Sequence, residues 1–130
     1  MHAVELEASI VTFLEGDIVH THFKDNLLVQ VADVQAMFDA IAAERKGRKA
    51  LLMVSVGMGT TMTNEARAYA SAPESARYVA ADAIIVRDFG HQLAANVFVR
   101  YHKPTRPIQM FPDQQSALDW LRSQQYLLDQ

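Results

Sequence analysis

Cysteine is absent from the 130 residues of this chain. Disulfides, thiolate metal sites and cysteine nucleophiles are therefore excluded. Long apolar runs are absent too, since no stretch approaches the roughly 20 residues that span a bilayer. Residues 1–7 carry two glutamates and lack the basic-then-apolar pattern of a secretory signal. We therefore expect a cytoplasmic protein without a transmembrane segment.

An excess of positive charge is also missing. The formal net charge is -3 at pH 7, which gives no electrostatic footprint for a phosphate backbone. A basic cluster at Arg45, Lys46, Arg48 and Lys49 falls where a helix is expected to end, and cations there complement the helix dipole. Nucleic acid is not expected as a partner.

What is present is ordinary globular composition. Hydrophobic residues make up 50% of the chain and charged residues 21%, far from the signature of disorder. The length is close to the commonest domain size, and neither repeats nor linkers are found. We expect one domain spanning residues 1–130.

An N-terminal hairpin is predicted from two segments rich in β-branched and aromatic residues, 4–14 and 18–23. Gly16 and Asp17 are taken as its two-residue loop. The predicted pairs on the buried face are Leu14 with Val19, Thr12 with Thr21 and Ile10 with Phe23, whereas Val11, Phe13, Ile18, His20 and His22 are assigned to a partly covered face.

Strands and helices alternate along the rest of the chain. Residues 31–46 have apolar positions on one helical stripe, with Gly47 as a stop, and residues 50–56 form an apolar run typical of a strand buried on both faces. Further elements are expected as a short helix that is capped by Thr63 and ends at Ser71, a strand at 83–86, a helix at 89–101, a strand at 107–111 and a final helix capped by Asp113. The order β-β-α-β-α-β-α-β-α predicts an α/β fold with a mostly parallel sheet and an antiparallel N-terminal hairpin.

Several short segments carry a family resemblance. They are Asp17 to His20, Asn64 to Arg67, Ala95 to Phe98, Lys103-Pro104, Pro107 to Phe111, and Ala117 to Leu121. Together with the element order, they resemble an uncharacterised bacterial family of STAS-like proteins, similar in fold to anti-sigma-factor antagonists and related to CRAL-TRIO lipid-binding domains. The resemblance implies a single STAS-like domain. Regulatory STAS domains present a phosphorylatable serine or threonine before the helix that follows the third strand, but the stretch from Thr60 to Asn64 lacks their aspartate-serine pattern.

The segment from Ser55 to Asn64 leaves a buried parallel strand and enters a helix. Ligands of open α/β sheets favour that edge, and exposed N–H groups there suit anions. A plain turn explains the segment as well, because a lone Gly-x-Gly is neither a P-loop nor a dinucleotide fingerprint, and no cofactor is predicted. The candidate partner- or ligand-binding residues are Gly57, Met58, Gly59, Thr60, Thr61, Met62, Thr63, Asn64 and Arg67.

No catalytic constellation is found in the sequence. No serine sits in a Gly-x-Ser-x-Gly elbow, and Asp82 and Asp88 are interpreted as a solvated face or a helix cap. His20 and His22 share one face of a strand, but without a third ligand they are interpreted as a surface pair and no metal site is predicted. His91 and His102 are expected to contact solvent.

These observations favour a non-catalytic regulatory or protein-interaction module that meets its partner through the 57–67 segment. Met58 and Met62 stand in a predicted exposed loop and would supply an apolar patch there. The alternative is a small carrier with an apolar or lipid-like ligand between sheet and helices. A homodimer is compatible with both, and a hydrolase would require a cleft with converging polar groups.

Overall fold

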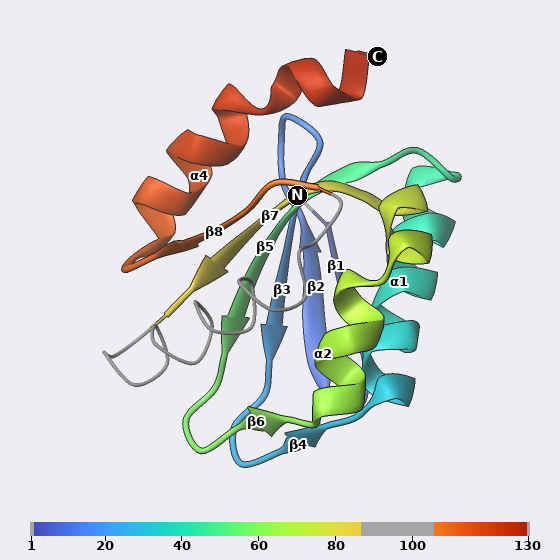
Figure 1. The fold of residues 1–130 in the computed structure, drawn as a ribbon, viewed down its shortest axis with the longest axis vertical. Helices are drawn as coiled ribbons and strands as arrows, with labels where there is room; N and C mark the ends of the chain where they lie inside the picture. Colours follow the sequence, from blue (N-terminus) through green and yellow to red (C-terminus); the bar gives the residue numbers. More distant parts are fainter. Residues whose placement is uncertain (1, 87–105, 130) are drawn as a thin grey trace.

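The computed structural model describes residues 2–86 and 106–129 (Figure 1). The strands are β1 (His2–Glu5), β2 (Ser9–Phe13), β3 (Ile18–Phe23), β4 (Leu28–Val29), β5 (Ala50–Val56), β6 (Thr61–Met62), β7 (Val79–Ile85) and β8 (Ile108–Phe111). The helices are α1 (Val31–Arg45), α2 (Asn64–Ser71) and α4 (Gln114–Ser123), with 3-10 turns at η1 (Pro73–Arg77) and η2 (Gln125–Asp129). In these two ranges, none of the helices combines the length and apolar character required to cross a membrane.

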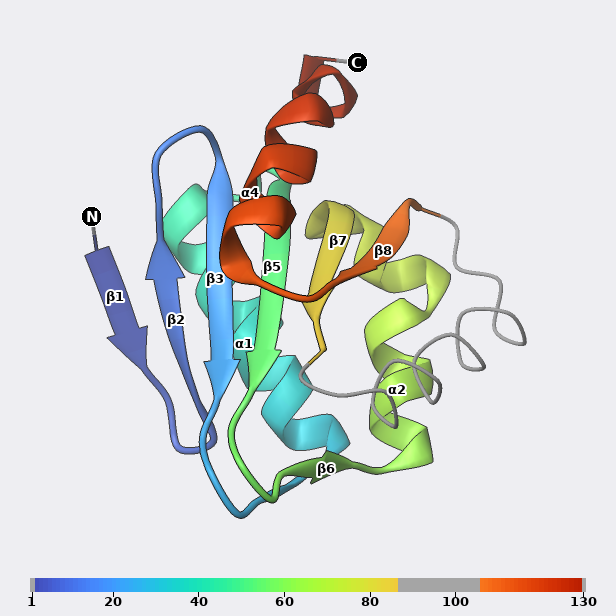
Figure 2. The same ribbon diagram turned by 90° about the vertical axis from the view of Figure 1, so that its left-hand side faces the viewer.

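Six strands form one mixed sheet in the order β1-β2-β3-β5-β7-β8 (Figure 2). The pairs β1–β2 and β2–β3 are antiparallel, whereas β3–β5, β5–β7 and β7–β8 are parallel. Beyond the end of this sheet, β4 and β6 form a small parallel pair. The predicted α/β fold class, with a mostly parallel sheet and an antiparallel N-terminal hairpin, is confirmed.

Helices cover both faces of the sheet. Both α1 and α2 lie on one face and α4 on the other (Figures 1 and 2). On the first face, Phe38 and Ile41 of α1 pack in one cluster with Leu52 of β5. On the second, Leu121 of α4 packs with Leu51 of the same strand. Because β3, β5 and β7 follow one another in one direction, right-handed crossovers place α1 and α2 on the same side.

Local hydrogen bonds and backbone conformation determine where helix α1 begins and ends. The backbone N–H of Gln30 donates to Asp33 Oδ2 at 2.9 Å, so a first-turn carboxylate satisfies an otherwise unpaired donor. Lys46 and Gly47 both adopt left-handed conformations, with φ of 55° and 81°, which end the helix close to the predicted residue.

The predicted hairpin register is wrong by one residue. The loop has three residues, because the N–H of Leu14 donates to the carbonyl of Ile18 at 2.8 Å, and the pairs are Val11 with Thr21 and Phe13 with Val19. A one-residue shift exchanges the partners on each face. As a result Val11 is completely buried, whereas Ile10 is 36% exposed on the opposite face.

Other predicted boundaries also need correction. The expected strand 4–14 is broken at residues 6–8 into β1 and β2, and the short strands β4 and β6 were not predicted. Strand β7 begins at Val79 rather than at residue 83, so Asp82 lies inside a buried strand rather than on a solvated face. The predicted helix 89–101, His91, His102 and two of the family-like segments lie outside the described residues.

The corrected register places a buried hydroxyl without a partner in the core. Thr21 Oγ1 has no hydrogen-bond partner among the described residues, and the side chain is inaccessible. We expect Thr21→Val to raise the free energy of unfolding by about 1 kcal/mol, because it removes the cost of an unsatisfied buried group. Urea denaturation measures the change.

Thr60 is the matched control for this substitution. It is also buried, but Thr60 Oγ1 donates to the carbonyl of Lys24 and accepts from the N–H of Leu27 at 3.1 Å. Thr60→Val is expected to lower the free energy of unfolding by about 2 kcal/mol, since it leaves two backbone groups unpaired. If Thr21→Val and Thr60→Val change the free energy of unfolding in the same direction, this explanation is wrong.

Candidate functional site

Two loops join at the carboxyl end of the parallel strands. Residues 24–27 follow β3 and residues 57–60 follow β5; we name them the loop pair. The N–H of Met58 donates to Asp25 Oδ1 at 2.9 Å, and the N–H of Asn26 donates to the carbonyl of Met58 at 2.8 Å. With the two bonds of Thr60, these contacts fix the loop pair as one unit at the edge where α/β sheets bind ligands.

Glycine is required where the two loops meet. A Cβ on Gly57 would lie 2.6 Å from the backbone nitrogen of Asp25 and 2.7 Å from the carbonyl carbon of Lys24. Gly59 has a φ of 75° and faces the side chain of Asn26. These two glycines therefore allow one loop to approach the other closely. Their role in the predicted site is structural.

Helix α2 starts directly behind the loop pair. Thr63 caps it, because its side-chain oxygen accepts from the N–H of Ala66 at 3.0 Å, as the sequence predicts. Ala66 is completely buried, so the small residues of α2 allow it to pack against its neighbours. The helix thereby holds Arg67 and Ala70 at the wall of a cavity.

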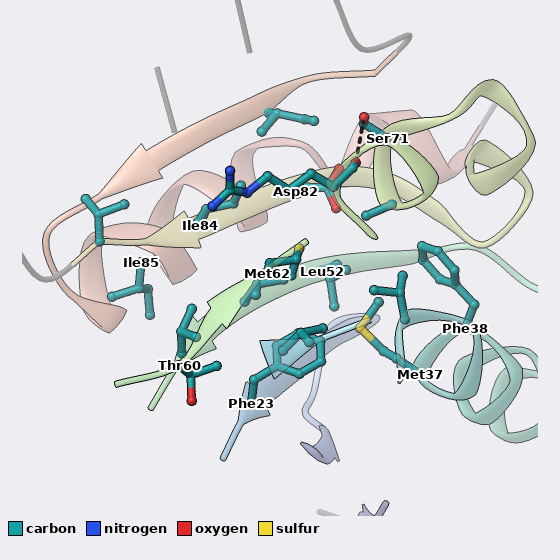
Figure 3. Close-up of a pocket in the computed structure, with 18 of the residues that line it drawn as sticks. Phe23, Met37, Phe38, Leu52, Thr60, Met62, Ser71, Asp82, Ile84 and Ile85 are labelled. Carbon is teal, nitrogen blue, oxygen red and sulfur yellow. Dashed lines mark hydrogen bonds between the residues drawn. The ribbon is translucent and has the colours of Figure 1, made fainter. Parts of the chain in front are cut away.

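That cavity lies between the sheet and the two helices on its first face (Figure 3). Its volume is about 230 Å³. Apolar side chains make up most of the wall, and they come from β3, α1, β5, β6 and β7; among them are Phe23, Met37, Phe38, Leu52, Met62 and Ile84. Val86 and Arg106, which flank the undescribed stretch of the chain, line it as well.

The structure divides the candidate residues into three groups. Thr60, Thr61, Met62 and Arg67 line the cavity, whereas Gly57, Gly59 and Thr63 shape the loops and the helix start. Met58 points to solvent with 69% of its surface exposed, and Asn64 is exposed at the first position of α2. The expectation that Met62 lies in an exposed loop is wrong, because it is partly buried in β6 and packs against the core.

An ion pair that the sequence analysis missed forms the polar part of the wall. Asp82 and Arg106 are 6% and 8% exposed, and both line the cavity. Arg106 Nε donates to Asp82 Oδ2 at 2.5 Å, Nη1 donates to Ser75 Oγ at 2.5 Å, and Nη2 donates to the carbonyl of Ala70 at 2.8 Å. Burial raises the pKa of the Asp82 carboxyl, and the adjacent guanidinium opposes that rise. The one available signal was an aspartate within an apolar run, Ala80 to Ile85.

The opposite face of the sheet carries the two histidines noted in the sequence. Ser55 Oγ lies 2.8 Å from His20 Nε2 and 2.8 Å from His22 Nδ1, so the hydroxyl can donate to one ring and accept from the other. The pair is therefore partly buried and hydrogen-bonded rather than a free surface pair. Within residues 2–86 and 106–129, no cluster of three or more metal-ligating side chains is found.

This arrangement predicts a loss of stability at low pH. Burial, and to a lesser extent the His22 ring, lowers the pKa of His20 below its usual 6.5. The unfolded chain therefore takes up a proton that folded His20 resists, and the free energy of unfolding falls as the pH drops below about 6.5.

Unfolding curves between about pH 8 and pH 5 test this prediction. His20→Gln should flatten the pH dependence, whereas the control His2→Gln, at a position whose side chain is 56% exposed, should retain it. An unchanged slope in the His20 variant would rule out His20 as its source.

Comparisons with known proteins agree with this architecture. The model of a family described as "Domain of unknown function (DUF7793)" matches residues 12–125. The structure is similar to the crystal structure of an uncharacterised protein from the DUF3478 family with a SpoIIAA-like fold, from Shewanella loihica PV-4, at a TM-score of 0.59 and 18% identity. The similarity covers 88% of this chain and 92% of that one, and it confirms the predicted STAS-like fold. No curated protein matches the sequence.

Proposed function

Because this chain belongs to the DUF7793 family, a domain of unknown function, we propose its role from its own geometry: a non-catalytic binding module that holds a small apolar molecule in the cavity. The observation that supports this proposal is a space of about 230 Å³ whose wall is mostly apolar. Apolar pockets with a few placed polar groups are the usual form of small-molecule sites.

The volume limits the size of the ligand. An engineered apolar cavity of about 150 Å³ stays dry and binds benzene, which has six carbon atoms. In proportion, about 230 Å³ accommodates roughly nine non-hydrogen atoms. The proposed ligand is thus a short-chain or single-ring compound, and a full-length lipid would have to extend beyond the cavity.

Methionine methyl groups provide a direct test. Met37 and Met62 line the cavity, Met53 is buried in the core on the other face of the sheet, and Met58 is exposed. In a chain labelled with ¹³C at the methionine methyls, octan-1-ol should shift the signals of Met37 and Met62 and leave those of Met53 and Met58 in place. No shift at Met37 or Met62 would show that the cavity is not a ligand site in the whole chain.

A second candidate, a regulatory or protein-interaction module, rests on exposed apolar residues at the loop pair. Met58 is 69% exposed, Leu28 is 55% exposed and Val31 is 37% exposed, and they lie on or beside the joined loops. Exposed large apolar side chains mark interaction surfaces where they form a contiguous patch. Met62, which was expected to share this patch with Met58, belongs to the cavity wall instead.

Met58→Ser combined with Leu28→Ser tests this second role. A partner captured by the wild-type chain should be lost by the double variant, while the melting temperature changes little because both side chains face solvent. Tyr126→Ser is the matched control, since Tyr126 is 57% exposed on η2, away from the loop pair. If the control loses the partner to the same extent, the loop pair is not the surface that binds it.

A further inference from the structure

The cavity combines an apolar wall with one fully formed ionic group, and this combination restricts the charge of a ligand. Asp82 and Arg106 carry one negative and one positive charge and are both more than nine-tenths buried. The net charge of this ion pair is therefore zero. The remaining charged side chain in the described part of the wall belongs to Arg67. This side chain is only partly buried, so water screens its positive charge.

The hydrogen bonds of this pair are only partly used. A guanidinium has five N–H donors, and the described bonds of Arg106 occupy three of them. Asp82 Oδ2 accepts from Arg106, and no bond to Asp82 Oδ1 is found within the described residues. Within residues 2–86 and 106–129, the pair therefore keeps two N–H donors and one carboxylate oxygen that could bond a head group.

A charged head group does not suit this wall. A carboxylate could accept from Arg106, but it would place a second negative charge beside Asp82; an ammonium would face the reverse problem with Arg106. Either ion would enter a mostly apolar space in which the two buried charges, Asp82 and Arg106, already neutralise each other, and burial of a further charge is costly unless it is paired. A neutral group that both donates and accepts can use the spare N–H and the spare oxygen together.

We propose that the ligand of the cavity is an uncharged amphiphile: an apolar body of roughly nine non-hydrogen atoms with an alcohol or primary amide head placed against the Asp82–Arg106 pair. This inference rests on the proposed function, because it names the chemical class of molecule for the same cavity. It adds that the buried ion pair selects the head group, while the apolar wall selects the body.

Three probes with the same eight-carbon chain distinguish the proposed ligand site from the proposed preference for an uncharged head group. They are octan-1-ol, octanoate and octylammonium, titrated at about pH 7.5, where the last two are charged. The shifts of the Met37 and Met62 methyls report binding. We expect octan-1-ol to bind at least about tenfold more tightly than either ion. Equal affinities, or tighter binding of an ion, would overturn the head-group inference and leave the cavity as a ligand site. Absence of binding by all three would overturn both.

Asp82→Asn provides an independent measurement. The substitution keeps the shape of the side chain but leaves the positive charge of Arg106 unbalanced, so octanoate should gain at least about tenfold in affinity relative to octan-1-ol. Asp119→Asn is the matched control, since Asp119 is exposed on α4 on the other face of the sheet, and its selectivity should equal that of wild type. An unchanged preference in Asp82→Asn would overturn the inference, and the wild-type titration still decides it if that variant does not fold.

Discussion

Replacement of Gly57 by alanine is expected to lower the free energy of unfolding by about 3 kcal/mol, because the added methyl group meets backbone atoms that cannot move aside. The Cβ would lie 2.6 Å from the nitrogen of Asp25 and 2.7 Å from the carbonyl carbon of Lys24. Gly57 is also held in place, since its own N–H donates to the carbonyl of Phe23 at 2.7 Å. Relief of the clash therefore requires the two loops to separate and to lose the bonds between them.

Gly47→Ala is the appropriate control for this substitution. Gly47 has a φ of 81°, but nothing lies within 4 Å of a Cβ placed on it. Alanine there incurs only the cost of a left-handed conformation, about 1 kcal/mol. Urea denaturation of both variants separates the two causes. Similar losses in the two variants would mean that backbone conformation, rather than the contact between the loops, explains the need for glycine at position 57.

The loop pair also contributes to the cavity wall, through Thr60 and the residues that follow it in β6. We expect Gly57→Ala to weaken the binding of octan-1-ol more than Gly47→Ala does, because separation of the loops moves Thr60 and Met62. The Met62 methyl signal of the unliganded variant measures that movement directly. An unperturbed Met62 in Gly57→Ala would show that the two loops do not depend on each other.

Elements with strong local signals could be predicted from the sequence. The one-sided apolar pattern and Gly47 give α1 with an error of one residue at its end, and the apolar run at 50–56 coincides with β5. Thr63 caps α2 as expected. In each of these cases, periodicity or capping within one segment determines the result, so distant parts of the chain are not needed.

The hairpin shows where local reasoning fails. Gly16 and Asp17 both adopt a positive φ, as in a two-residue turn, yet the loop includes Glu15 as well. A loop longer by one residue shifts every cross-strand pair and exchanges the buried and the exposed residues of β2. Val11 and Ile10 have similar hydrophobicity, so composition alone could not show which of them faces the core.

The cavity could not be predicted from any one segment. Its walls come from strands and helices that are distant in sequence, and only the 60–67 part lies in the candidate segment. Asp82 and Arg106 are 24 residues apart in the sequence, and their pairing follows from the adjacent positions of β7 and β8. A lone aspartate among alanines suggests a buried charge only when its cation is known.

Arg106→Met is expected to lower the free energy of unfolding by about 4 kcal/mol, which is the second large effect. The variant removes the cation and leaves Asp82 buried without its counter-charge. It also removes the bonds that join Arg106 to Ser75 and to the carbonyl of Ala70, so β7, η1 and the end of α2 lose a common anchor. Urea denaturation near neutral pH measures the loss.

A double variant separates the cost of the orphaned charge from the value of the ion pair. Asp82→Leu with Arg106→Met replaces the pair by apolar side chains beside an existing cavity, and such replacements are often neutral or stabilising. We therefore expect the double variant to recover most of the stability lost in Arg106→Met. If it is as unstable as the single variant, the bonds to Ser75 and Ala70, rather than the buried charge, account for the loss. Recovery of stability with loss of selectivity between octan-1-ol and octanoate would indicate that the pair contributes to ligand recognition more than to folding.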